Sequence, residues 1–139
     1  MIAYIDSSVL LRIALNEGNQ LSEFHDITLG GSSRLLKSEC LRSLDRLVVM
    51  GRLSQSEMIF ATEYIYEVLD RMEIMPISEN ILERIGEPLG LNLGTLDAIH
   101  LFSAVAWRWQ KNHNPVFLTH DVALGRAAQV FGFRVMGIL

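Results

Sequence analysis

Apolar residues along the chain fall into short unbroken runs and into longer stretches with helical spacing. The runs Ile2-Ala3-Tyr4-Ile5 and Val116-Phe117-Leu118 are typical of strands buried on both faces. In longer stretches, such as 54–71, apolar residues recur three and four positions apart, which is typical of amphipathic helices. The pattern predicts strands at about 2–5, 34–37, 74–77, 116–119 and 133–136, and helices at about 8–16, 38–49, 54–71, 79–87, 96–109 and 122–130.

Polar residues and glycines mark the expected ends of these elements. Serine or threonine stands where it can cap a helix at Ser38, at Ser54 or Ser56, at Ser78 and at Thr95. The sequence Gly30-Gly31-Ser32-Ser33 predicts a turn, and Pro76 favours an edge position for the strand at 74–77. Strands that alternate with helices indicate a parallel sheet covered on both faces. We therefore expect an α/β fold in a single domain over residues 1–139.

Four acidic residues stand where a parallel α/β sheet directs side chains into one crevice. Asp6 and Asp121 follow predicted buried strands, whereas Glu39 and Asp97 lie in the first turns of predicted helices. These positions meet at the carboxyl edge of such a sheet. Carboxylates gathered there repel one another, so a bound cation is the simplest reason for the arrangement. We expect a divalent metal site formed by these four acids.

Each acid taken alone also has an ordinary structural explanation. Asp6 and Asp121 can cap the helices that follow them. Asp97 lies in a first helical turn, where the helix dipole favours a carboxylate by roughly 0.3–1 kcal/mol. This explanation is strained for the whole set, because Glu39 is a poor capping residue and Thr95 already fills the capping role before Asp97. The joint pattern favours a site.

The residue types narrow the chemistry of this site. Oxygen-only ligands suit Mg²⁺ or Mn²⁺, which retain water molecules and pair with substrate phosphates. Such ions support phosphodiester hydrolysis by activating water and stabilising the leaving oxygen. The four histidines are scattered along the chain without zinc-site spacing, and Gly30-Gly31 lacks the spacing of a phosphate-binding loop.

Composition sets limits on the substrate and on the compartment. The net charge is −4, from 12 basic and 16 acidic residues, so the chain is not a basic nucleic-acid-binding protein by overall charge. Ten of the 12 basic residues are arginine, which suits bidentate phosphate contacts. The N-terminus is expected to be a strand and not a signal peptide, and no apolar run is long enough for a membrane span. With one cysteine, Cys40, expected to be buried, a cytoplasmic location is the simplest expectation.

Several short motifs resemble those of a known family. They are Asp6-Ser7-Ser8, Ser38-Glu39 with Arg42 one turn later, Leu96-Asp97-Ala98-Ile99-His100-Leu101, Thr119-His120-Asp121, Ala127-Ala128 and Gly132-Phe133. In this order and spacing they resemble the PIN-domain ribonucleases over essentially the whole chain. The closest resemblance is to the small VapC-type toxins of VapBC toxin–antitoxin pairs. The chain departs from the pattern at Phe102, where a small residue is expected, and over residues 16–33, which match no motif.

The resemblance implies a PIN-like three-layer α/β/α fold with about five parallel strands. It implies an endoribonuclease that uses Mg²⁺ or Mn²⁺ to cleave RNA, a cognate antitoxin protein that blocks the site, and commonly a homodimer. By position, Asp6, Glu39, Asp97 and Asp121 would be the catalytic, metal-binding acids. Ser8 and Thr119 would support them as hydroxyls that orient carboxylates.

Other candidate residues are given simpler roles. His100 lies one turn after Asp97 and is expected to be a packed histidine, although it could contact phosphate or substrate. His120 is expected to point away from the site, because side chains alternate at a strand end. Trp107 and Trp109 are expected in the core or an interface. Apolar residues outside the main stripes of the helices at 38–49 and 54–71 indicate either a partner surface or burial on two sides: Ile59, Phe60 and Tyr64.

The sequence alone is compatible with other functions. A housekeeping PIN nuclease without an antitoxin would have the same residues. A non-catalytic PIN-like binding module is expected to lose one or more acids, and here all four are present. An aspartyl phosphotransferase also has an aspartate after its first strand, but it needs a second acid two positions on, where this chain has Ser8.

Overall fold

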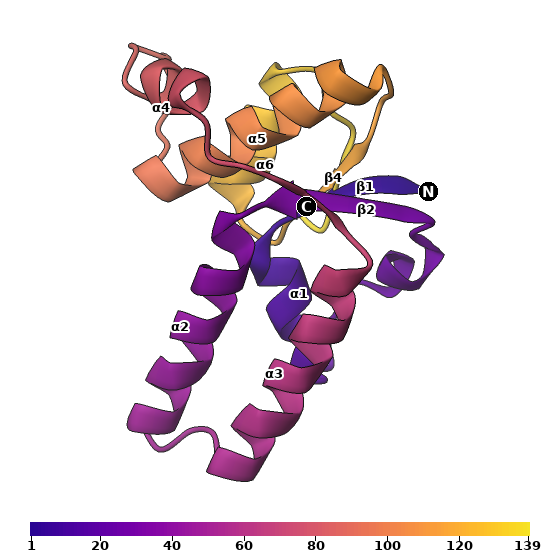
Figure 1. The fold of residues 1–139 in the computed structure, drawn as a ribbon, viewed down its shortest axis with the longest axis vertical. Coiled ribbons are helices and arrows are strands. Elements are labelled where there is room, and N and C mark those ends of the chain that lie inside the picture. Colours follow the sequence, from indigo (N-terminus) through magenta and orange to yellow (C-terminus); the bar gives the residue numbers. More distant parts are fainter.

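A five-stranded parallel sheet forms the centre of the molecule (Figure 1). The computed structural model describes all 139 residues. The strands lie in the order β3-β2-β1-β4-β5, and every neighbouring pair is parallel. Their bounds are β1 Ile2–Ile5, β2 Leu29–Ser33, β3 Glu73–Met75, β4 Val116–Leu118 and β5 Val135–Met136.

Helices cover both faces of the sheet, which confirms the expected three-layer α/β/α fold. One layer consists of α1 (Ser7–Ala14), α2 (Leu35–Val49) and α3 (Gln55–Asp70), and the other of α4 (Glu79–Ile85), α5 (Thr95–Lys111) and α6 (Val122–Val130). A short 3₁₀ helix, Ser22–Asp26, precedes β2. In Figure 1, α2 and α3 form a hairpin that extends away from the sheet. No helix in the structure is both long enough and apolar enough to cross a membrane.

Alternation along the central strands divides the interior into two cores. Tyr4 and Phe117 stack with ring centroids 5.0 Å apart and pack with α5 and α6. Ile5 and Leu118 face the opposite core, against α1, α2 and α3. Cys40 is fully buried in this second core, where burial, with smaller contributions from nearby carboxylates, raises the pKa of its thiol to about 12. The expected packing role of this cysteine is therefore confirmed.

The predicted caps were right for two helices and wrong for two. Ser54 forms a capping box with Glu57, and Ser78 accepts a hydrogen bond from the backbone N–H of Ile81. Thr95 is not a cap, because α5 begins one residue earlier than expected and Gly94 occupies the N-cap position. Ser38 is not a cap either, because it lies inside α2.

The largest error of the sequence analysis concerns residues 30–37. The predicted turn at Gly30-Gly31-Ser32-Ser33 is part of β2, and the predicted strand at 34–37 is the start of α2. The glycines are required by close packing: a Cβ atom on Gly31 would lie 2.6 Å from the Trp107 ring. Ser32 donates to the Ile5 carbonyl at 2.6 Å, so this polar side chain is satisfied inside the sheet.

Strand β3 occupies the edge position that Pro76 predicted, and α5 holds it in place. Its Glu73 accepts a hydrogen bond from Trp107 Nε1 at 2.8 Å and pairs with Lys111 at 3.0 Å. Trp107 is fully buried, as expected, whereas Trp109 is exposed. Phe102, the departure from the family pattern, is buried beneath the Arg84 guanidinium, whose carbon lies 4.4 Å from the ring centroid.

Replacing Gly31 by alanine is expected to destabilise the protein by about 1–3 kcal/mol, because the added methyl group must displace the buried Trp107 ring. Denaturant unfolding of the purified variant measures this change. Gly18→Ala is the matched control, since a Cβ atom at Gly18 would meet nothing within 4 Å. Equal stability of the two variants would show that β2 does not need this close approach.

Candidate metal centre

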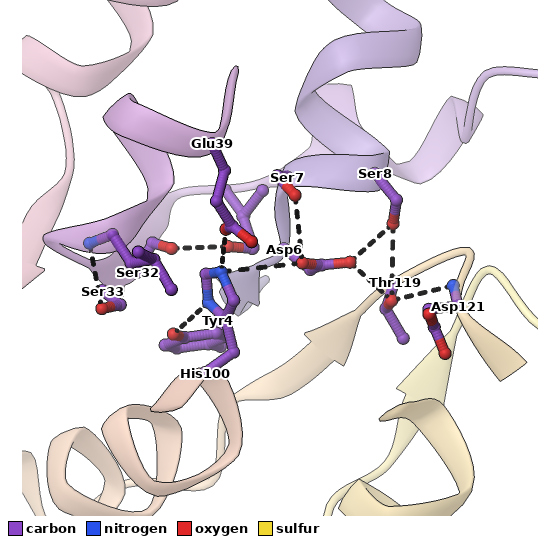
Figure 2. Close-up of polar contacts among 12 residues, drawn as sticks. Tyr4, Asp6, Ser7, Ser8, Ser32, Ser33, Glu39, His100, Thr119 and Asp121 are labelled. Carbon is purple, nitrogen blue, oxygen red and sulfur yellow. Dashed lines mark hydrogen bonds and ion pairs between the residues drawn. The ribbon is translucent and has the colours of Figure 1, made fainter. Parts of the chain in front are cut away.

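Asp6 lies at the centre of a hydrogen-bonded group at the carboxyl edge of β1 (Figure 2). Only 4% of the residue is exposed. Its Oδ2 accepts hydrogen bonds from Ser8 Oγ at 2.6 Å and from Thr119 Oγ1 at 2.8 Å. Although Asp6 occupies the N-cap position of α1, its side chain makes no capping hydrogen bond. The capping explanation therefore fails for this acid.

Ser8 and Thr119 are themselves fixed by the backbone around them. The N–H of His120 donates to Ser8 Oγ at 2.9 Å, and the N–H of Asp121 donates to Thr119 Oγ1 at 3.0 Å. The two hydroxyl oxygens lie 3.4 Å apart. With both hydroxyls held by N–H donors, their protons are directed at the Asp6 carboxylate. This arrangement joins α1, β1 and the loop after β4 at one side chain.

Glu39 and His100 reach the same point from opposite sides of the sheet edge, as Figure 2 shows. His100 Nε2 makes a short hydrogen bond to Glu39 Oε1 and lies 3.8 Å from Asp6 Oδ1. The other ring nitrogen, Nδ1, is 2.8 Å from the Tyr4 hydroxyl. Burial lowers the pKa of His100, but the hydrogen bond to Glu39 and the nearby carboxylates outweigh it, so the pKa is raised overall.

Asp97 lies in the first turn of α5 and is half-buried. No hydrogen bond or ion pair to its carboxylate is present in the structure. Its pKa is raised to about 6, first by burial and then by the negative charges of Asp121 and Asp6. The three carboxylates therefore lie within electrostatic range of one another, and this repulsion was expected for an acidic crevice without a cation.

Asp121 is the most exposed of the four acids and has a structural role as well. Its Oδ1 accepts a hydrogen bond from the N–H of Leu124 at 2.9 Å and so caps α6. The capping explanation is correct for this residue, and its second carboxylate oxygen is left without a hydrogen bond. The neighbouring His120 turns away, as expected, with Nδ1 3.0 Å from the Gly137 carbonyl.

The donor set fits a small cation. Asp6, Glu39 and His100 each place one ligand-type atom within 4.8 Å of the others, which is close enough to share one ion. Asp97 and Asp121 form no such tight group with the other acids, but their charges act on the same space. The structure thus brings two of the four predicted acids into ligand distance and the other two into electrostatic range.

His100 is the residue whose position sequence reasoning described incompletely. It is packed and hydrogen-bonded within the fold, as expected, yet its Nε2 faces the acids. The spacing of three positions from Asp97 already placed it on the same face of the helix. Tyr4, its partner on β1, carried no signal because it lies within an apolar run.

Replacing Asp97 by asparagine is expected to stabilise the metal-free protein by about 1 kcal/mol at pH 7.5, after allowance for solvent screening. The pKa of Asp97 is about 6 in the fold and about 3.9 when unfolded, so the wild type loses stability as the pH rises between these values. Near pH 4 the difference between variant and wild type should largely vanish.

Urea unfolding in EDTA at pH 4 and pH 7.5 measures this effect. Glu63→Gln is the control, because Glu63 is an exposed acid on α3 without a hydrogen bond or an ion pair. A loss of stability in Asp97→Asn at pH 7.5 would show that Asp97 is a structural residue.

Comparison with known proteins identifies the family. Residues 3–130 match the PIN domain family, and a search of curated proteins found no match. PIN domains are generally nucleases that act on the phosphodiester bonds of nucleic acids, and they typically use divalent metals. The match runs from β1 through α6 and contains all four acids, so the chain belongs to the PIN domain family.

Proposed function

We propose that the chain is a Mg²⁺- or Mn²⁺-dependent endoribonuclease and the VapC-type toxin of a type II toxin–antitoxin pair. The observation that carries this proposal is the conformation of Asp6. Its carboxylate makes no capping hydrogen bond to the backbone of α1. The Ser8 and Thr119 hydroxyls hold one oxygen, and the other oxygen lies 3.8 Å from His100 Nε2, which is bonded to Glu39. A buried carboxylate held in this way is well placed to bind a cation, which can in turn bind a phosphate. Burying it for the stability of the fold alone would be unfavourable.

We assign the metal-binding and catalytic role to Asp6, Glu39, Asp97 and Asp121. A bound Mg²⁺ or Mn²⁺ would supply water activation and charge neutralisation at the scissile phosphate. The protein's own part is positioning. Ser8 and Thr119 fix the Asp6 carboxylate, and the hydrogen bond from His100 orients Glu39 toward Asp6.

Asp97 and Asp121 complete the proposed centre with oxygens that the fold does not use. Asp97 has no hydrogen-bond partner, and Asp121 uses one oxygen for its cap. Unpaired carboxylate oxygens beside a tight acidic group are costly without a cation. This cost is the second reason for assigning metal binding to the whole set.

A groove beside the acids is suited to the antitoxin that we propose as partner. It has a volume of about 540 Å³ and runs between α1 and α2 from Ser8 to Met50. Its charged lining residues are Arg46 and Arg12, the latter paired with Glu17 at 3.9 Å, and its apolar lining includes Leu11, Leu15 and Leu47. Met50 lines the groove and is exposed, and α2 and α3 carry further exposed apolar side chains: Val49, Ile59 and Phe60. Tyr64 does not belong to this surface, because it packs against the core.

A segment with apolar and acidic side chains could lie along this groove and reach the acids. A homodimer, a single-domain organisation over residues 1–139 and a cytoplasmic location stay predictions. A housekeeping nuclease would share the catalytic centre and differ in having no such partner.

Purified protein is expected to cut total cellular RNA into discrete fragments with Mg²⁺ or Mn²⁺ and to leave it intact with EDTA. Asp97→Asn should reduce cleavage at least about a hundredfold, because it removes a charge that would face the metal. Gel analysis of the fragments, with Glu63→Gln as the control, measures both effects. Cleavage that persists in EDTA or in Asp97→Asn would contradict the proposed centre.

If the protein binds RNA in the presence of metal but never cuts it, the chain is a PIN-like binding module and not a nuclease. Mn²⁺ should in either case raise the melting temperature of the wild type by mass action and leave Asp6→Asn nearly unchanged.

Met50→Glu is expected to weaken inhibition by the protein encoded beside the chain's gene at least about tenfold, since a charge then replaces an exposed apolar contact in the groove. RNA cleavage by the variant alone should stay at the wild-type rate. Titration of the cleavage reaction with that partner measures the change. Unchanged inhibition would place the partner elsewhere on the surface.

A further inference from the structure

A second, polar cavity opens at the carboxyl edge of the sheet, on the α3 side of α2. Its volume is about 440 Å³. Only two of its six lining residues are apolar, unlike the groove between α1 and α2. The lining residues are Ser33, Arg34, Lys37, Ser38, Leu69 and Ile74.

The two charged side chains of this cavity, Arg34 and Lys37, are both cationic. Neither forms an ion pair with an acidic side chain. The ion pairs of the basic residues involve Arg12, Arg42 and Lys111, not Arg34 or Lys37. Arg34 is exposed, and its guanidinium makes no hydrogen bond. The Lys37 Nζ lies 5.0 Å from the centre of the Tyr66 ring, which is its one directed contact. The cavity therefore carries two positive charges without ion-pair partners, although the whole chain has a net charge of −4.

The position of the cavity relative to the acids follows from the strand order and from α2. Ser33 ends β2, and Asp6 directly follows β1, the neighbouring strand. Ser33 and Asp6 are therefore separated along the edge by about one strand spacing of 4.8 Å. Ser38 lines the cavity, and the next residue is Glu39. In Figure 2, Ser33 lies on the side of Glu39 and Asp6 away from Asp121.

We propose that this cavity binds a backbone phosphate of the RNA strand next to the phosphodiester bond that the acids address, with Arg34 and Lys37 as its ligands. This inference rests on the proposed function, because it assumes that the strand crosses the carboxyl edge of the sheet. An RNA strand that passes over Asp6 and then along the sheet edge toward β2 reaches this cavity next. The cationic cavity is where its next phosphate loses the repulsion of the carboxylates.

The proposal also accounts for how an acidic protein holds a polyanion. Arginine provides a planar donor pair for phosphate oxygens, and lysine adds a point charge that the Tyr66 ring holds near the opening. Ser33 and Ser38 leave the remaining wall polar. An acidic peptide would also be attracted to the two cations, so the test compares it with RNA.

The test measures binding of a mixed-sequence single-stranded RNA to the Asp97→Asn protein in Mg²⁺ as a function of salt. Each phosphate contact contributes about 0.7 to the slope of log K against log salt for single strands. The Arg34→Gln, Lys37→Gln double variant in the same background loses one phosphate contact and should therefore show a slope about 0.7 smaller in magnitude. Gln keeps much of the side-chain length and removes the charge.

Arg134→Gln is the matched control. Arg134 is exposed and unpaired, and it precedes β5 at the opposite edge of the sheet, so its removal should leave the slope unchanged. Thermal unfolding of each variant checks that the fold is intact.

The outcomes separate the inference from the proposed function. A double variant whose slope equals that of the Arg134→Gln control overturns the phosphate site, even if the wild type cleaves RNA. A slope reduced by about 0.7 supports the site, even if the wild type fails to cleave. Absence of salt-dependent RNA binding by the parent protein overturns the phosphate site, whereas cleavage by the wild type decides the proposed function. An equal loss of binding to an acidic peptide of the same charge would assign the cavity to a protein partner and overturn the RNA site.

Discussion

The repulsion among carboxylates at the carboxyl edge of the sheet is the constraint on which the rest of the site depends. Asp6 is nearly inaccessible to solvent, and a buried charge of this kind needs partners. The structure supplies hydroxyl donors from Ser8 and Thr119 on one side and the His100 ring on the other. The two hydroxyl donors come from α1 and the loop after β4, and the His100 ring on α5 lies 3.8 Å from the other carboxylate oxygen. One carboxylate thus gathers three elements around the end of β1.

The acidic edge of the sheet and the apolar core share residues, so neither can be described alone. The Tyr4 ring stacks on Phe117 in the core, and its hydroxyl meets His100 Nδ1. When charged, His100 donates from both nitrogens, to Tyr4 and to Glu39. A fully buried imidazole is thus oriented from the core side and acts on the carboxylates at the edge. Packing in the core thereby sets the direction of Glu39.

The sequence predicted the elements that contain a run or a helical stripe of apolar residues. It missed elements whose burial depends on contacts with residues far away in the chain. Apolar runs gave β1 and β4, and the acids that follow them were then placed at the correct edge. Strand β2 was missed because Gly31 must make room for Trp107, a residue 76 positions away, and no local pattern records that contact. The Asp121 cap and the Asp6 hydroxyl contacts also depend on tertiary structure, since Asp residues at both helix starts look alike in sequence.

The distribution of charge explains how an acidic chain can act on nucleic acid at all. The four acids of the centre equal its net charge of −4, so the rest of the surface is balanced. Most of the attraction for a polyanion must then come from local features and not from the field of the whole protein. In the proposed centre a bound cation would remove the repulsion at Asp6, Glu39, Asp97 and Asp121, and the cations of the neighbouring cavity would direct the strand. Binding of substrate and binding of metal should therefore be coupled, each favouring the other at this edge of the sheet.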